Sequence, residues 1–131
     1  MLIRSIIISS VLSIISFQVQ AGAVLIKAVE FSRGSADWTV NVTLAHADTG
    51  WEHYADGWRV VDPTGKELGM RTLYHPHVNE QPFTRSLSGV AIPANISKVF
   101  VEARDKKHGW SKDRVMVDLS KSKGPRYTVR R

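Results

Sequence analysis

The 131-residue sequence contains no cysteine. Disulfide bonds are therefore excluded, although they are the usual reinforcement of small exported domains, so a stable fold must rest on packing alone. The same absence leaves no residue to carry the lipid of a lipoprotein. It also excludes a blue-copper centre, which needs a cysteine sulfur, so any metal site must use imidazole and oxygen ligands.

The motifs of several enzyme classes are missing as well. The sequence has no nucleophile elbow, no HExxH zinc motif, no glycine-rich phosphate loop and no thiol nucleophile. His108, Ser111 and Asp113 are the residue types of a hydrolytic triad, but three residues so close together in one loop rarely assemble one. We therefore expect a protein that is not an enzyme.

The first 21 residues predict a signal peptide. Met1 to Arg4 provide a short positive start, and residues 5–17 form an apolar run that is too short to span a bilayer comfortably. Residues 19–21 offer the small side chains that a signal peptidase recognises. Cleavage after Ala21 is expected, with cleavage after Ala23 or an uncleaved anchor as alternatives. The sequence thus predicts a periplasmic or secreted protein with one domain.

Positive charge is concentrated near the C-terminus. Residues 22–103 hold seven Lys or Arg against nine Asp or Glu, whereas residues 104–131 hold ten against three. We expect residues 120–131 to be a basic tail, either a solvated strand end or a mobile segment. Weak attraction of this tail to anionic lipid headgroups or to an acidic partner is the alternative. Nucleic-acid binding is not expected, because no recognition motif accompanies the charge.

Apolar and polar residues alternate along short segments separated by turn residues, without a helical period. Trp38, Val40, Val42 and Leu44 alternate with polar neighbours, which predicts a strand with one buried face that His46 extends. Seven strands are expected, over residues 24–31, 38–45, 57–61, 67–74, 83–91, 98–104 and 114–119. This pattern predicts one all-β domain, an immunoglobulin-like or fibronectin type III-like antiparallel β-sandwich over residues 22–119, with Trp58 in its core.

The histidines are expected to meet at one end of this sandwich. If successive strands are antiparallel, the loops 46–56, 75–82 and 105–113 lie at the same end, and the turns 62–66 and 92–97 lie at the other. All five histidines fall in the first set of loops: His46, His53, His75, His77 and His108. Their shared position predicts a functional surface there.

A transition-metal site is the first functional hypothesis. Residues two apart on an extended chain point to the same side, and Pro76 favours an extended His75, so His75 and His77 could bind one ion together. His46, His53 and His108 are candidate further ligands. Nitrogen and oxygen ligands without sulfur suit copper(II), zinc or nickel.

The second hypothesis is a non-catalytic interaction or accessory module of the cell envelope. Aromatic and arginine side chains often anchor protein interfaces. The same loops offer four such residues to a protein partner: Trp51, Tyr54, Arg85 and Trp110. A purely structural alternative is a rigid cap, in which His46 and His53 bond loop carbonyls and Arg85 pairs with Asp48 or Asp56.

Overall fold

A computed structural model describes residues 22–131; the predicted signal peptide, residues 1–21, lies outside the described residues. The described chain forms nine strands and no helix: β1 (Leu25–Arg33), β2 (Trp38–Ala45), β3 (Ala55–Val61), β4 (Glu67–Thr72), β5 (Phe83–Val90), β6 (Lys98–Asp105), β7 (Gly109–Asp118), β8 (Lys123–Gly124) and β9 (Tyr127–Arg130). Within these residues, no helix of sufficient length and apolarity to cross a membrane is present.

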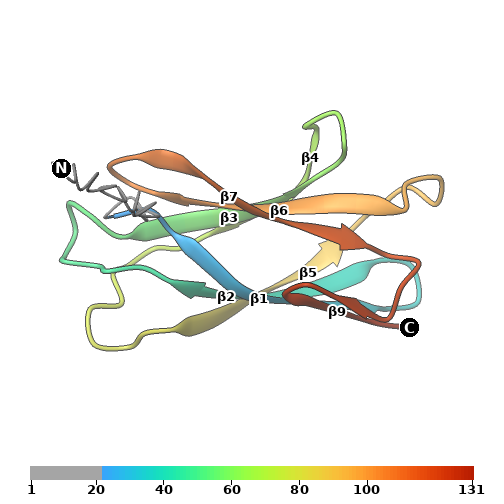
Figure 1. Ribbon diagram of the computed structural model, residues 1–131, viewed down its shortest axis with the longest axis horizontal. Coiled ribbons are helices and arrows are strands. Elements are labelled where there is room, and N and C mark those ends of the chain that lie inside the picture. The colour runs from blue at the N-terminus through green and yellow to red at the C-terminus, as the bar shows by residue number, and fades with distance from the viewer. Residues whose placement is uncertain (1–21) are drawn as a thin grey trace, which may run out of the picture.

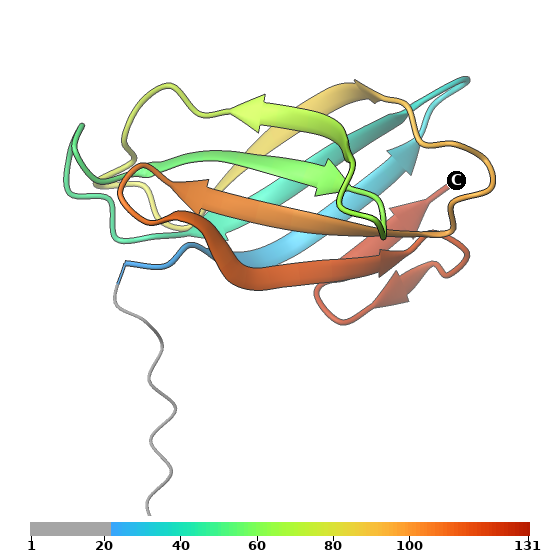
Figure 2. The same ribbon diagram turned by 90° about the horizontal axis from the view of Figure 1, so that it is seen from above.

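The strands build two sheets that face each other. One sheet has the order β5-β2-β1-β9-β8 and the other has the order β4-β3-β6-β7. Figure 1 shows the two layers edge-on, and Figure 2 looks onto the four-stranded sheet. All neighbouring strands are antiparallel except β1 and β9, which are parallel. The predicted all-β sandwich is confirmed.

The core forms because apolar residues alternate along the strands and fill the space between the sheets. β2 is the clearest case, since Trp38, Val40, Val42 and Leu44 are all buried while the residues between them are half-buried on the other face. Trp58 on β3 is fully buried, as its place in the predicted third strand suggested. Burial of such apolar area is the main stabilising contribution in a fold without disulfides.

The C-terminal segment differs from the prediction. Residues 120–131 were expected to be a tail outside the domain, but β9 pairs with β1 and buries Tyr127 and Val129. Pro125 and Arg126 connect β8 to β9, and Arg126 adopts a φ of 63°, as the third residue of a type II turn requires. The period-two alternation of Tyr127 and Val129, and not the surrounding charge, determines the structure here.

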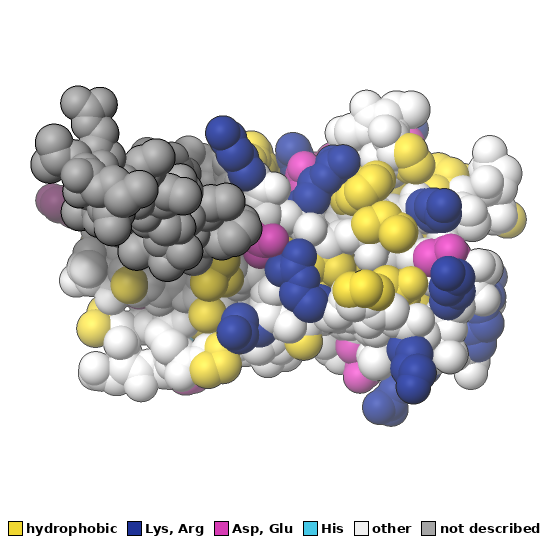
Figure 3. All heavy atoms as spheres, viewed as in Figure 1, with side chains coloured by type: hydrophobic (Ala, Val, Ile, Leu, Met, Phe, Trp, Pro, Cys, Tyr) yellow, Lys and Arg dark blue, Asp and Glu magenta, His cyan; other side chains and the backbone are white. Residues whose placement is uncertain are grey.

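The basic residues are spread over the surface. Figure 3 shows Lys and Arg side chains interspersed with apolar ones over much of the face viewed. Several belong to ion pairs within the domain, such as Arg126 with Asp113 at 3.0 Å and Arg59 with Glu102 at 3.0 Å. The positive charge of the C-terminal quarter is therefore partly engaged in holding the sheets.

Three loops meet at one end of the sandwich, at the left of Figure 1. They are the β2–β3 connection (46–54), the β4–β5 connection (73–82) and the β6–β7 turn (106–108). We call this the histidine end, because all five histidines lie in these connections. The predicted placement of the loops is confirmed.

Candidate metal centre

Asp105 is the centre of the histidine end. Val99, Val101 and Ala103 face the core along β6, and Asp105 continues this inward set at the end of the strand with no exposed surface. The backbone N–H groups of Lys107 and His108 donate to its Oδ1. Burial raises the pKa of Asp105, but these donors and the His108 ring outweigh that effect and hold the pKa below its usual value, so the carboxylate stays ionised.

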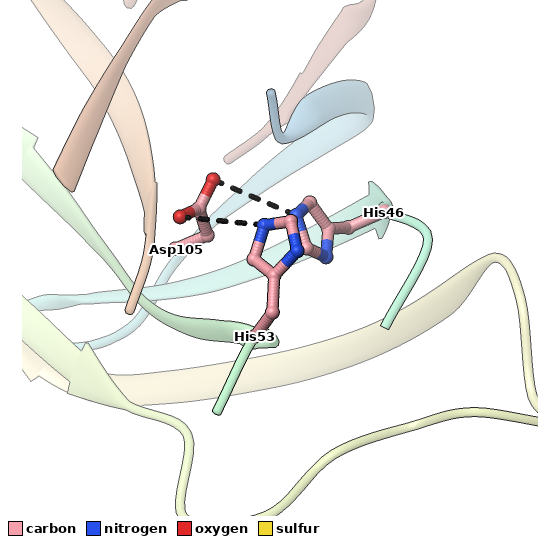
Figure 4. A group of neighbouring side chains, drawn as sticks. All are labelled: His46, His53 and Asp105. Atoms are coloured by element: carbon pink, nitrogen blue, oxygen red, sulfur yellow. Dashed lines mark ion pairs between the residues drawn. The ribbon is translucent and has the colours of Figure 1, made fainter. Parts of the chain in front are cut away.

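Two histidine rings lie against this carboxylate. Nε2 of His46 is 3.5 Å from Oδ2 of Asp105, and Nε2 of His53 is 3.7 Å from Oδ1. Figure 4 shows both rings turned toward Asp105; they come from the two ends of the β2–β3 connection, and Asp105 ends β6. One possible ligand atom from each of the three residues lies within 4.8 Å of the others. The group combines two imidazole nitrogens with one carboxylate.

The spacing is wider than that of hydrogen bonds. A tetrahedral zinc ion with ligands at 2.0–2.1 Å separates its ligand atoms by about 3.3–3.4 Å. The two contacts to Asp105 are close to this value, whereas direct N–H···O bonds are usually shorter than 3.2 Å. Nε2 of His53 is buried and has no hydrogen-bond partner among residues 22–131. The three ligand atoms, which lie within 4.8 Å of one another, would have to move only a short way to bind one small cation.

Asp48 orients the His46 ring through a contact with its Nδ1. Its Oδ1 is 2.5 Å from Nδ1 of His46 and accepts from the N–H of Ala55 at 3.0 Å, while its Oδ2 accepts from the N–H of His77 at 2.8 Å. Metal-binding histidines usually donate their other ring nitrogen to a carboxylate in this way. Asp48 therefore fixes the tautomer of His46 and joins two loops of the histidine end.

Both ring nitrogens of His46 face oxygen acceptors. Nε2 lies 2.8 Å from the carbonyl oxygen of Gly22, on the side of the ring opposite Asp48. The ring can satisfy both acceptors when each nitrogen carries a proton. A metal ion on Nε2 would take the place of one proton, so binding at this position must compete with protonation.

His108 is a candidate fourth ligand. Its Nδ1 lies 3.1 Å from both oxygens of Asp105, and its ring centroid is 5.0 Å from that of His53. The side chain is about half exposed and belongs to the β6–β7 turn, so it can rotate more freely than the buried His46. Three of the five predicted ligands, His46, His53 and His108, thus lie around Asp105.

His75 and His77 lie in a different arrangement. Their ring centroids are 4.7 Å apart, as the spacing predicted, but His77 stacks on Phe83 and its Nε2 accepts from Arg85 at 2.7 Å. Burial, followed by the charge of Arg85, lowers the pKa of His77. The lone pair of His77 Nε2 therefore already accepts a hydrogen bond from Arg85. The sequence interpretation made this pair the core of the site, but the group of possible ligand atoms centres on Asp105 instead.

The four predicted partner-binding residues make different local contacts. Trp51 is 62% exposed and packs edge-on against Tyr54, with ring centroids 6.0 Å apart. The Trp110 ring packs under the Arg59 guanidinium at 3.9 Å. Arg85 bonds His77 and pairs with Glu80, not with the predicted Asp48 or Asp56. Of the four, Trp51 presents the most exposed aromatic surface.

Sequence reasoning missed Asp105 and Gly22 as parts of this site. Asp105 could have been found, because it stands at the next inward position after Val99, Val101 and Ala103. An ionisable residue at such a position is buried and needs partners. Gly22 gave no local signal, since its contacts with His46 and His108 cross many residues of sequence.

Comparison with known proteins gives one relative. The chain is 39% identical over 92 residues to a protein of Halomicrobium mukohataei named "Putative lipoprotein"; the match covers 70% of this chain and 40% of that protein. The chain therefore spans well under half the length of this curated relative. No protein-family model matches the sequence. No solved structure matches it either.

Proposed function

We propose that this chain is a non-catalytic metal-binding protein of the cell envelope or the secreted fraction, and that it holds a zinc or copper(II) ion between His46, His53 and Asp105. The observation that carries the proposal is the convergence of these three side chains, from the β2–β3 connection and the end of β6, with their ligand atoms within 4.8 Å. His108 is the fourth ligand in this proposal, because its Nδ1 already contacts Asp105.

The electrostatics of the site support a cation. Asp48 and Asp105 are both buried carboxylates beside His46, and burying two negative groups is costly unless positive charge lies close by. A divalent ion supplies that charge and gives Nε2 of His53 the partner it lacks. Two imidazoles and one carboxylate suit zinc or copper(II), and affinity for such a set is greater for copper(II).

The compartment is proposed on two grounds. The N-terminal 21 residues have the pattern of a signal peptide. The relative from Halomicrobium mukohataei carries a lipoprotein name, which supports an envelope location. Lipid attachment at a cysteine is not part of the proposal, because residues 1–131 contain none.

Metal titration of the exported protein tests the proposal. Zinc and copper(II) should bind with 1:1 stoichiometry, and His53→Ala or Asp105→Asn should weaken binding at least tenfold. His75→Ala is the matched control, because His75 is exposed and lies outside the Asp105 group. Absence of binding in the unaltered protein refutes the proposal. Loss of binding in His75→Ala alone would place the ion at the His75–His77 pair instead.

An interaction module is a second candidate, favoured by exposed apolar side chains at the histidine end. Trp51, Tyr74 and Val78 all have more than half of their surface exposed there. The match to less than half of a longer protein also suits a domain that occurs beside others. In this case Trp51→Ala should abolish capture of an envelope partner without changing metal binding, whereas Met116→Ala, an exposed change on β7, should leave capture intact. Undiminished capture by Trp51→Ala would refute this candidate.

A further inference from the structure

The main chain of Gly22 forms part of the wall of the proposed metal centre. Its carbonyl oxygen lies 2.8 Å from Nε2 of His46. A Cβ atom added to Gly22 would lie 2.8 Å from Cε1 of His108 and 3.1 Å from Cε1 of His53. The backbone of Gly22 therefore contacts the His46 ring, and a side chain in place of its hydrogen would crowd the rings of His53 and His108.

Gly22 is held in this position by the residues that follow it. The N–H of Val24 donates to Oγ of Ser111 at 3.0 Å, and the N–H of Ile26 donates to Oδ2 of Asp113 at 3.1 Å. Val24 itself is fully buried in the core. The chain is thus fixed to β7 only two residues after Gly22, so residue 22 has little freedom to move away from the rings.

We propose that cleavage after Ala21 makes the amino group of Gly22 a further ligand of the metal ion. This inference rests on the proposed function and identifies an additional donor of the same site. The amino nitrogen is one bond, about 1.46 Å, from the Cα atom that packs against the rings. In an uncleaved chain this nitrogen is an amide, whose lone pair is delocalised into the peptide bond and does not bind a metal.

Cleavage changes the chemistry of that nitrogen. A free α-amino group has an ordinary pKa of about 7.7–8.0, so it can lose a proton near neutral pH and offer a lone pair. On binding, the proton passes to solvent and the lone pair goes to the ion, and no redox step is needed. The α-amine then joins the imidazoles of His46, His53 and His108 and the carboxylate of Asp105 in the donor set.

The inference distinguishes the two predicted cleavage sites. Cleavage after Ala21 leaves Gly22 at the start of the mature chain with its carbonyl beside His46. Cleavage after Ala23 would remove Gly22 and put the new terminus at Val24, whose backbone nitrogen is directed at Ser111. Only the first cut provides an amino group next to the three rings.

Two forms of the protein test the inference. One begins at Gly22 and the other keeps Ala21, so that the nitrogen of Gly22 remains an amide. Zinc and copper(II) affinities should be at least tenfold weaker in the form that keeps Ala21, with the same thermal unfolding midpoint in the absence of metal. His53→Ala in the Gly22 form is the control for the site as a whole and should bind weakly.

The outcomes separate the two proposals. Equal affinities in both forms, together with weak binding by His53→Ala, overturn the role of the amino group but leave the metal centre intact. Absence of binding in every form overturns the metal centre and with it the inference. The intact mass of the exported protein is a second measurement: a mature chain that begins at Gly22 supports the inference, and one that begins at Val24 overturns it.

Discussion

Replacement of Asp48 by alanine should be among the most destabilising single changes at the histidine end. Its carboxylate serves three groups that are distant in sequence: the ring of His46 and the backbone N–H groups of Ala55 and His77. Asp48 is buried, and all three of these carboxylate contacts lie in the interior. Alanine would leave all three groups without this acceptor in the interior.

The expected loss can be worked out from these contacts. A buried donor left without its partner costs about 1–3 kcal/mol, so three of them give about 3–9 kcal/mol. Domains of this size are stable by about 5–15 kcal/mol, and the change should therefore remove a large part of the total. Urea denaturation followed by the fluorescence of the tryptophans, including the buried Trp58, measures the loss.

Asp62→Ala is the matched control. Asp62 also accepts three hydrogen bonds, from Thr64 N, Thr64 Oγ1 and Lys66 N, but all of them lie within its own turn at the opposite end of the sandwich. Water can replace an acceptor at such a turn, so the loss should be clearly smaller than for Asp48→Ala. If the two variants lose equal stability, or if Asp48→Ala loses less than about 1 kcal/mol, the structural role assigned to Asp48 is incorrect.

Three further predictions concern other parts of the domain. Burial and the charge of Arg85 lower the pKa of His77. The stability that neutral His77 contributes is therefore present above its unfolded pKa of about 6.5 and is lost as the pH falls toward the folded pKa. The urea midpoint should fall less between pH 7 and pH 5 in His77→Gln than in the unaltered protein, and an equal fall would refute this. Truncation after Gly124 removes β9 and the buried Tyr127 and Val129, and should cost about 3–6 kcal/mol by urea denaturation, whereas a mobile tail could be removed at no cost. Trp110→Ala should lower the free energy of unfolding by about 1–2 kcal/mol, because the ring packs against the Arg59 and Arg104 guanidinium groups. The stability losses of Arg59→Ala and Trp110→Ala should not add in the double variant, and additive losses would argue against the stacking.

The sequence predicts the fold well where the signal is local. Alternation of apolar and polar residues along 38–45 is enough to define β2 and its inward face, and turn residues define the hairpin ends. The same alternation placed His46 at the inward position where the structure has it. The seven main strands follow from such patterns, although β7 begins at Gly109, within the loop predicted over 105–113, and not at residue 114.

The remaining features depend on contacts between distant segments. β9 was missed because the cationic residues around Tyr127 and Val129 suggested a solvated tail, and its partner β1 is nearly 100 residues away in the sequence. His75 and His77 have the side-by-side placement that local geometry predicts. The hydrogen bond of His77 with Arg85 and its stacking on Phe83 involve residues of β5, which the sequence did not connect with His77. Asp105 became central because the β-sheet register, and not a motif, brings His46 and His53 to it.

The parallel pairing of β1 with β9 has a consequence for how the domain forms. β1 is the first strand to leave the ribosome or to pass through a membrane from the N-terminal side, yet the partner for one of its edges is the last strand of the chain. That edge has no backbone partner until residues 127–130 emerge. Contacts of such long sequence separation are slow to form, so the five-stranded sheet is complete only after residues 127–130 have paired with β1.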